Sequence, residues 1–410
     1  MRTAIVRPFL DMLDWLDAYL TLRAQGGLLE HLVSFHNEHR LLWIRLLTML
    51  DVSVFAFSGV SFIAASTLAL LVAAGLVMRE AAHGAAPRGS GIVWLFGMLF
   101  VTFAGAVDCS VPVNAVYPLT LVFAVACICL FDGTDEAGSG TPWRRCAAVA
   151  CAASCGFGNA AGLLAWPVLA WTAWRGGAGW RWLAAVAVLG AAYCAAYLHG
   201  VTTVVSTLPT AEAHAPLDLA HLLKMLRYLL AYLGLPFTRL PVAMAPGMLL
   251  GALLLLAGSV ALLWLTLTAQ QVTRLQRVAG GLILFALGSA ALAAVGRADL
   301  AAEVAVPVRY TVFVAMLHAG LLALALPPLL ARPGGVRLAT RGAAGLAVLL
   351  LALQVAGGYA AMGVADRMAA GIERFYSGER GPAVMEAVYR DAARAEAILA
   401  RLRAEGLYRR

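Results

Sequence analysis

The sequence predicts an all-α fold, a polytopic bundle of transmembrane helices with polar flanks. Hydrophobic residues make up 62% of the 410 residues and charged residues only 13%, whereas an ordinary soluble domain has roughly 25% charged residues. Apolar runs near the ~20 residues that cross a bilayer as a helix recur along most of the chain. A soluble protein could not bury so much apolar surface, so we expect a multi-pass membrane protein.

Eight apolar runs predict membrane helices by length and composition. They cover residues 52–78, 92–107, 115–131, 182–198, 248–267, 278–295, 310–330 and 343–362. The apolar segment 145–174 is interrupted by Cys155-Gly-Phe-Gly-Asn159, and we expect two short or tilted helices that meet there, for about ten membrane segments in all. Non-helical backbone at this depth needs polar partners, so the hinge should border a cavity.

Arginines mark alternate connections between these segments and therefore predict the orientation. They are Arg79 and Arg88, Arg144 and Arg145, Arg175 and Arg181, Arg274 and Arg277, and Arg332, Arg337 and Arg341. Cytoplasmic loops retain positive charge, so the other connections and both ends of the chain should face outward. We expect an extracytoplasmic segment 1–51, a transmembrane domain 52–362 and an extracytoplasmic helical tail 363–410. The net charge of +8 belongs to these flanks, and without a basic stripe carrying interleaved aromatics we expect no nucleic-acid partner.

The first segment should contain a helix over residues 8–23. Asp11, Asp14 and Asp17 are spaced three apart and share one face. A solvated face of an interfacial helix is one interpretation, and a functional carboxylate is the other. No signal peptide or membrane helix precedes this outward segment; either the true start of translation lies upstream, or the segment is translocated without help.

The string Phe35-His36-Asn37-Glu38-His39-Arg40 places imidazole, amide, carboxylate and guanidinium groups directly before an apolar run. A metal site is conceivable from two histidines and a glutamate, but the spacing matches no strong zinc pattern, so a divalent metal is not indicated. A hydrogen-bonded cap on the next helix is a structural alternative. Further along, residues 217–233 predict an interfacial helix and residues 382–402 an amphipathic one.

The string His36-Asn37-Glu38-His39-Arg40, followed by Arg45 and preceded by Asp11, resembles a group of uncharacterised bacterial multi-spanning proteins. These proteins are similar in layout to the C-type glycosyltransferases (GT-C), which use polyprenyl-phosphate sugars. Gly156-Phe-Gly-Asn159 before Trp166-Pro167, and the pairs Gly296-Arg297 and Arg309-Tyr310, resemble further elements of the group. Two features depart from its pattern: a first membrane helix is missing, and Leu13 stands where a tryptophan is expected, with Trp15 further on.

The resemblance implies a sugar transfer from a polyprenyl phosphate, a lipid-linked donor, to an acceptor on the outer face of the bacterial cytoplasmic (inner) membrane. Asp11, with Asp14 as the second choice, would be the catalytic base. The expected substrate-binding residues are His36, Asn37, Glu38, His39, Arg40, Asn159, Arg297, Arg309 and Tyr310. Among them Arg297 and Arg309 would hold the phosphate. Besides the donor, membrane lipids are the expected partners.

Two other classes of function are compatible with the pattern. A transporter or lipid flippase would also use a broken helix such as the one at residues 155–159, although the polar residues cluster in the outward loops. A non-catalytic membrane scaffold is the third possibility. For Arg309 the structural alternative is an arginine whose side chain reaches the outer interface.

Overall fold

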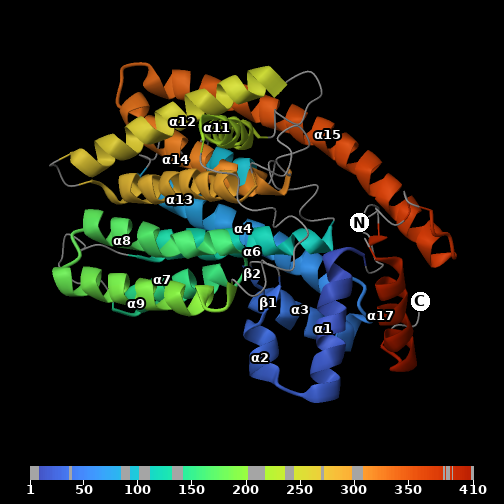
Figure 1. The fold of residues 1–410 in the computed structure, drawn as a ribbon. Helices are drawn as coiled ribbons and strands as arrows, with labels where there is room; N and C mark the ends of the chain where they lie inside the picture. The colour runs from blue at the N-terminus through green and yellow to red at the C-terminus, as the bar shows by residue number, and fades with distance from the viewer. Residues whose placement is uncertain are drawn as a thin grey trace.

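The computed structural model describes residues 9–36, 39–84, 93–100, 111–131, 142–201, 218–235, 244–268, 272–297, 308–381, 384, 388–389 and 391–407. Helices dominate these residues, and their β structure is one short hairpin (Figure 1). The predicted all-α fold is confirmed.

The amino-terminal part consists of short elements that cross one end of the bundle. They are α1 (Asp11–Gln25), α2 (Leu28–Val33), β1 (Phe35–His36), β2 (His39–Arg40) and α3 (Leu42–Phe55). Helix α1 agrees with the predicted helix within a few residues at either end. The two strands pair antiparallel, with His36 opposite His39. Because residues directly opposite in an antiparallel pair lie on the same face, the hairpin presents both histidines together.

The first predicted span, residues 52–78, is wrong at its start. Helix α3 ends at Phe55, and Ala56 and Phe57 adopt positive φ values of 48° and 53° before α4 (Val60–Gly84) begins. The buried Asp51 carboxylate accepts hydrogen bonds from the N–H groups of Gly59 (2.8 Å) and Ser61 (2.9 Å). These bonds satisfy donors that the first turn of α4 would leave unpaired, so the membrane-length helix begins at Val60.

The remaining helices of the bundle lie mostly side by side (Figure 1). They are η2 (Pro112–Ala115), α6 (Val116–Leu130), α7 (Pro142–Gly156), η3 (Ala160–Leu164), α8 (Ala165–Arg175), α9 (Trp180–Leu198), α11 (Leu219–Leu233), α12 (Met244–Leu267), α13 (Arg274–Arg297), η5 (Val308–Tyr310) and α14 (Thr311–Leu330). The predicted interruption at residues 155–159 is confirmed between α7 and η3. Residues 93–100 are helical, and the rest of the predicted span 92–107 lies outside the described residues.

Seven helices within the described ranges are long and apolar enough to cross a membrane. They cover Val60–His83, Pro112–Leu130, Trp180–Leu198, Met244–Leu267, Arg274–Arg297, Thr311–Leu330 and Gly335–Ala352. Helices α6, α13 and α14 are mostly enclosed, whereas α9 and α12 leave most of their apolar side chains exposed, as helices that face lipid do. The close approach of α13 and α14 requires Gly320, because a Cβ there would lie 2.7 Å from the Ala279 carbonyl oxygen.

The two ends of the bundle differ in chemistry. At one end the buried Glu80 carboxylate of α4 pairs with Arg274 of α13 at 2.6 Å, and Arg274 also donates to the carbonyl of Cys129 on α6 at 3.2 Å. Nearby, Arg175 of α8 donates to the carbonyl of Thr268 at 3.1 Å. We call this the arginine end. The opposite end, which we call the hairpin end, carries β1 and β2, the start of α6, the end of α13 and the start of α14.

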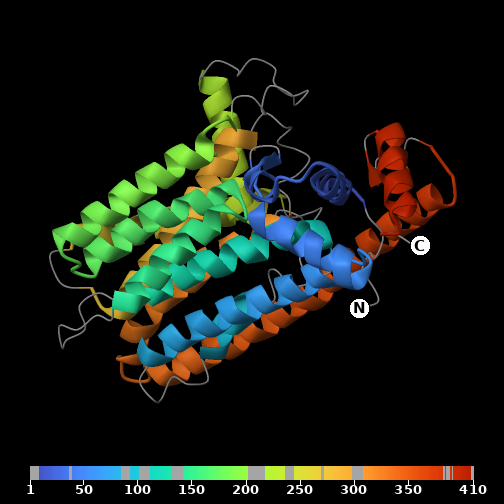
Figure 2. The ribbon, with the colours of Figure 1, turned by 90° about the horizontal axis from the view of Figure 1, so that it is seen from below.

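The carboxyl-terminal part returns to the hairpin end. Helix α15 (Gly335–Tyr376) has 42 residues, about 63 Å at ~1.5 Å per residue, and so extends well past the predicted span 343–362. Figures 1 and 2 show α15 reaching beyond the bundle to α17 (Ala392–Ala404), which packs against α1. The helix predicted over 382–402 is wrong at its start, because Tyr389 and Asp391 are not helical and the Asp391 carboxylate caps α17 at the Arg394 N–H (3.0 Å).

Candidate functional site

A cavity of about 180 Å³ lies at the hairpin end, where α1, the hairpin, the start of α6, the end of α13 and η5 meet. Its lining combines an apolar wall with charged and hydrogen-bonding side chains from segments far apart in the sequence. The lining residues are Asp11, Trp15, His36, His39, Leu41, Val113, Val116, Tyr117, Arg297 and Arg309.

Asp11 contributes the carboxylate of the cavity from the first turn of α1, where a negative charge is stabilised by the helix dipole. Its side chain is half-exposed, and Oδ2 lies 3.8 Å from Nε2 of His36. Burial alone would raise the pKa of Asp11, but interaction with His36, the positive charge of Arg309 and the nearby imidazole of His39 outweigh that effect and hold the pKa below its ordinary value. Asp11 is therefore ionised at neutral pH.

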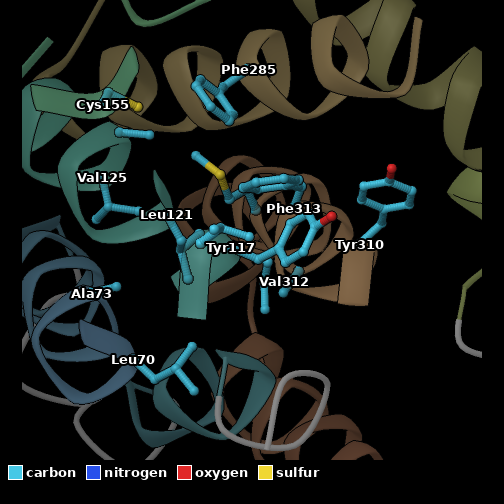
Figure 3. Packing of buried hydrophobic residues seen from close by; sticks show 14 of the residues in the cluster. Leu70, Ala73, Tyr117, Leu121, Val125, Cys155, Phe285, Tyr310, Val312 and Phe313 are labelled. Carbon is cyan, nitrogen blue, oxygen red and sulfur yellow. The ribbon is translucent and has the colours of Figure 1, made fainter. Parts of the chain in front are cut away.

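Arg297 and Arg309 approach the cavity over a cluster of tyrosine rings. The Arg309 guanidinium lies 5.5 Å from the ring centre of Tyr117, and the Arg297 guanidinium lies 6.0 Å from that of Tyr310. Tyr310 in turn meets Tyr117 edge to face at 5.4 Å and stacks on Tyr232 at 5.0 Å. Figure 3 shows Tyr117 and Tyr310 within this cluster. The rings support both arginines by cation–π attraction, although Tyr310 itself does not line the cavity.

The charge of Arg309 is well supported. Burial would lower its pKa, but Tyr117, Tyr310 and Asp11 raise it, and the net result lies above the ordinary value despite the nearby charge of Arg297. Two guanidinium groups thus share one small cavity with a single described carboxylate in its lining, Asp11. The charge balance favours an anion.

His39 connects the cavity to the hinge between α7 and η3. The N–H of Ala160 donates to Nδ1 of His39 at 3.3 Å, which places the proton of the neutral ring on Nε2. Asn159, one residue earlier, caps η3 by accepting from the N–H of Ala161 at 2.9 Å. Asn159 therefore does not line the cavity, and it supports the segment that holds His39.

Arg40 and the neighbouring Arg45 fix the hairpin in place. Arg40 donates to the carbonyls of Tyr197 (2.9 Å) and His199 (2.8 Å) at the end of α9, and its guanidinium lies 4.0 Å from the ring centre of Phe35. Arg45 is buried and donates to the carbonyls of His31 and Phe35. Neither arginine lines the cavity, because their donors are engaged by the backbone.

Asp14 is close to the cavity but does not line it. Its Oδ1 accepts a hydrogen bond from the Tyr389 hydroxyl and lies 3.1 Å from Nη2 of Arg394. Ligand atoms of Asp11, Asp14 and His36 lie within 4.8 Å of one another, a spacing at which three groups can hold a metal ion. Arg394 already places a positive charge at Asp14, which disfavours a second cation there, so the arrangement does not point to a metal.

Three residues that line the cavity hold a buried nitrogen with no hydrogen-bond partner among the described residues. These atoms are Nε1 of Trp15, Nε2 of His36 and Nε of Arg309. The tryptophan and arginine nitrogens are donors, and the histidine nitrogen is a donor when protonated. A buried donor without a partner costs roughly 1–3 kcal/mol. Nε1 of Trp15 and Nε of Arg309 favour a ligand with acceptor oxygens, whereas Nε2 of His36 already lies 3.8 Å from the Asp11 carboxylate.

The structure brings together five of the residues predicted for the site and separates the others. Those at the cavity are Asp11, His36, His39, Arg297 and Arg309. Asp14, Arg40, Asn159 and Tyr310 support its surroundings, whereas Asn37 and Glu38 lie outside the described residues. Sequence reasoning missed Trp15 and Tyr117. For Trp15 a signal existed, because a tryptophan was expected close behind the aspartate, and Trp15 reaches the cavity from one helical turn after Asp11.

Comparison of the chain with protein-family models, with curated proteins and with solved structures finds no match in any of the three. The fold itself defines a multi-pass α-helical membrane protein.

Proposed function

We propose that the protein is a membrane glycosyltransferase that moves a sugar from a polyprenyl phosphate to an acceptor at the outer face of the bacterial cytoplasmic membrane. The convergence of unpaired donors and two arginines on one cavity at the end of an apolar bundle is the observation that carries this proposal. The proposal includes about ten membrane segments: the seven long apolar helices, the pair formed by α7 and η3–α8, and the segment around residues 93–100.

A lipid phosphate fits the cavity in charge and in position. Arg297 and Arg309 supply positive charge, and hydrogen bonds between guanidinium and phosphate groups are roughly twice as strong as those between neutral groups. Leu41, Val113 and Val116 supply an apolar wall beside them. The cavity lies at the hairpin end, where membrane-length helices such as α6 and α14 start. A lipid headgroup lies at the same depth in the membrane.

The transfer step uses the cavity residues in distinct roles. The acceptor oxygen forms a bond to the anomeric carbon of the sugar while the bond between that carbon and the phosphate oxygen breaks. The polyprenyl phosphate departs with the electron pair, and Arg297 and Arg309 stabilise its charge. The proton of the acceptor hydroxyl passes to the Asp11 carboxylate.

The lowered pKa of Asp11 constrains how it acts. It keeps the carboxylate ionised and so able to accept a hydrogen bond from the acceptor hydroxyl. It also weakens Asp11 as a base, since proton transfer is most efficient when the pKa lies near the working pH. The main contribution of Asp11 is then to orient the hydroxyl, with proton transfer late in the reaction.

A transporter or flippase of lipid phosphates is the second candidate. It is favoured by the hinge between α7 and η3, which meets the cavity through the hydrogen bond from Ala160 to His39, because interrupted membrane helices form the binding sites of many transporters. Such a protein would need the arginines but no base. Asp11 therefore separates the two candidates.

The test compares Asp11→Asn with Arg309→Ala in the full-length protein purified in detergent. Binding is measured by calorimetry with farnesyl phosphate, and transfer is measured with polyprenyl-phosphate sugars and a panel of acceptors. Asp11→Asn should bind farnesyl phosphate at least as tightly as the unmodified protein but lose transfer by ~100-fold or more. Arg309→Ala should weaken binding by roughly 10- to 100-fold, since it removes hydrogen bonds to a charged group.

Arg332→Ala is the matched control, because Arg332 is an exposed arginine just after α14 at the arginine end. It should bind and transfer normally. Failure of the unmodified protein to bind farnesyl phosphate would remove the proposal. Binding that depends on Arg309, together with movement of the lipid across vesicles that Asp11→Asn leaves intact, would establish the flippase instead.

A further inference from the structure

The carboxyl-terminal segment reaches the edge of the cavity from some 375 residues away in the sequence. The Tyr389 hydroxyl donates to Oδ1 of Asp14, and Nη2 of Arg394 lies 3.1 Å from the same oxygen and 3.4 Å from Oδ2 of Asp17. Both acidic residues belong to α1, the helix that carries Asp11. The contact therefore places a positive charge directly behind the cavity.

Apolar packing and a second ion pair hold this segment on α1. Val388 and Ile398 are fully buried, and the N–H of Leu10 donates to the carbonyl of Val388. One turn further along α1, Arg401 pairs with Asp17 at 3.0 Å. Arg394 and Arg401 thus both pair with Asp17, but only Arg394 also contacts Asp14, the acidic residue beside the cavity.

The charge of Asp14 matters because of its position. Carboxylate oxygens of Asp14 and Asp11 and a ring nitrogen of His36 lie within 4.8 Å of one another. An uncompensated Asp14 would add a second negative charge at a site whose other charges, Arg297 and Arg309, favour an anion. Arg394 cancels that charge, and the hydroxyl of Tyr389 occupies the same carboxylate oxygen.

We propose that the carboxyl-terminal segment completes the anion site: Arg394, with Tyr389, neutralises Asp14, so that a bound phosphate meets the charge of Asp11 but not that of Asp14. This inference rests on the proposed function, because it takes the cavity to bind phosphate. Arg394 acts through Asp14 and is a positioning residue. Asp14, the second choice for a base from the sequence, then has an electrostatic role in place of a catalytic one.

A double-mutant cycle of Asp14 and Arg394 in the full-length protein tests the proposal. Binding is measured with inorganic phosphate and with farnesyl phosphate. Asp14 and Arg394 together contribute no net charge. Arg394→Ala leaves a net negative charge and should weaken binding by about 10-fold, the order expected for one charge near a partly buried site. Asp14→Asn leaves a net positive charge and should bind equally or more tightly. The double variant restores neutrality and should bind like the unmodified protein.

The direction in which each substitution changes binding separates this proposal from a purely structural role of the ion pair. If the ion pair only fastens α17, Asp14→Asn should weaken binding as much as Arg394→Ala does, and the double variant should show no recovery; that result would overturn the inference. Arg401→Ala is the control, since it removes a cation from Asp17, one turn further from the cavity, and leaves the Arg394–Asp14 contact in place; it should change binding by less than about 2-fold.

A second readout does not depend on ligand binding. Carbodiimide coupling of glycine ethyl ester, read by mass spectrometry, should label Asp11 but little of Asp14, and Arg394→Ala should expose Asp14 while Arg401→Ala should not. Equal labelling of Asp14 in the unmodified protein, Arg394→Ala and Arg401→Ala would show that Arg394 does not shield the Asp14 carboxylate. If the labelling pattern is as expected but the unmodified protein binds neither probe, the proposed function and the role of Arg394 in an anion site would both be rejected. The shielding of Asp14 by Arg394 would still hold.

Discussion

Arginines around the cavity divide into two kinds according to what their guanidinium groups contact. Arg40 and Arg45 donate to backbone carbonyls and so complete the fold of the hairpin. Arg297 and Arg309 line the cavity and lie over tyrosine rings, which attract the guanidinium cation. Because Arg297 and Arg309 line the cavity and Arg40 and Arg45 do not, we propose the phosphate role for Arg297 and Arg309.

His31 gives a pH-dependent test of the packing below the hairpin. Burial, and secondarily the charge of Arg45, lower the pKa of His31 to about 4, against roughly 6.5 in an unfolded chain. Between these two values the unfolded chain binds a proton that the folded chain does not, so stability falls as the pH falls. We expect a loss of about 2 kcal/mol in the free energy of unfolding between pH 7.5 and pH 5.

Thermal unfolding of the full-length protein in detergent at the two pH values measures this loss. His31→Gln keeps an acceptor near Arg45 but has no proton to gain, so it should lose less stability on acidification than the unmodified protein does. An equal loss in both proteins would assign the pH dependence to other groups.

At the scale of elements, the break between α3 and α4 decides where the first membrane helix starts. Asp51→Ala removes the acceptor for two buried N–H groups, and we expect the free energy of unfolding to fall by about 2 kcal/mol or more. Ser53→Ala is the control, because the Ser53 hydroxyl is exposed and donates to the Met49 carbonyl within its own helix. A similar effect of both substitutions on the unfolding temperature would contradict the capping role.

The sequence predicted the elements better than their boundaries. Apolar length located the cores of seven membrane-length helices, and the glycines and asparagine at 156–159 marked the hinge. The break at Ala56 and Phe57 escaped because neither residue carries a turn signal; the available clues were Asp51 inside an apolar run and the Ser58-Gly59 pair directly after the break. The length of α15 escaped because its apolar stretch ends well before the helix does.

For the site, the sequence predicted which polar residues gather there. It did not predict which of them bond to the backbone and which line the cavity. Arg40 and Arg309 carry the same functional group, and only three-dimensional contacts reveal that the first is engaged by α9. Tyr117 gave no polar signal beyond its position at the start of an apolar run. The partners of Asp14 could not be predicted, because Tyr389 and Arg394 belong to the carboxyl-terminal segment at the far end of the chain.

The two ends of the molecule carry different charged side chains, and this difference predicts how the protein is oriented in the membrane. Arg175 and Arg274 meet their partners at the arginine end, whereas Asp11, the cavity and α17 lie at the hairpin end. Since positively charged loops are retained in the cytoplasm, we expect the arginine end inside and the hairpin end outside. Both terminal segments, α1 and α17, then lie on the outer side with the cavity.

Cysteine labelling in intact cells tests this orientation, using a variant in which all seven native cysteines are replaced by alanine. Ser377→Cys places an exposed thiol at the far end of α15, and Ala331→Cys places one just after α14 at the arginine end. A membrane-impermeant maleimide should label the first in intact cells and the second only after permeabilisation. The reverse pattern would put the cavity in the cytoplasm, where an outward-facing acceptor could not reach Asp11, and would exclude transfer at the outer face of the membrane.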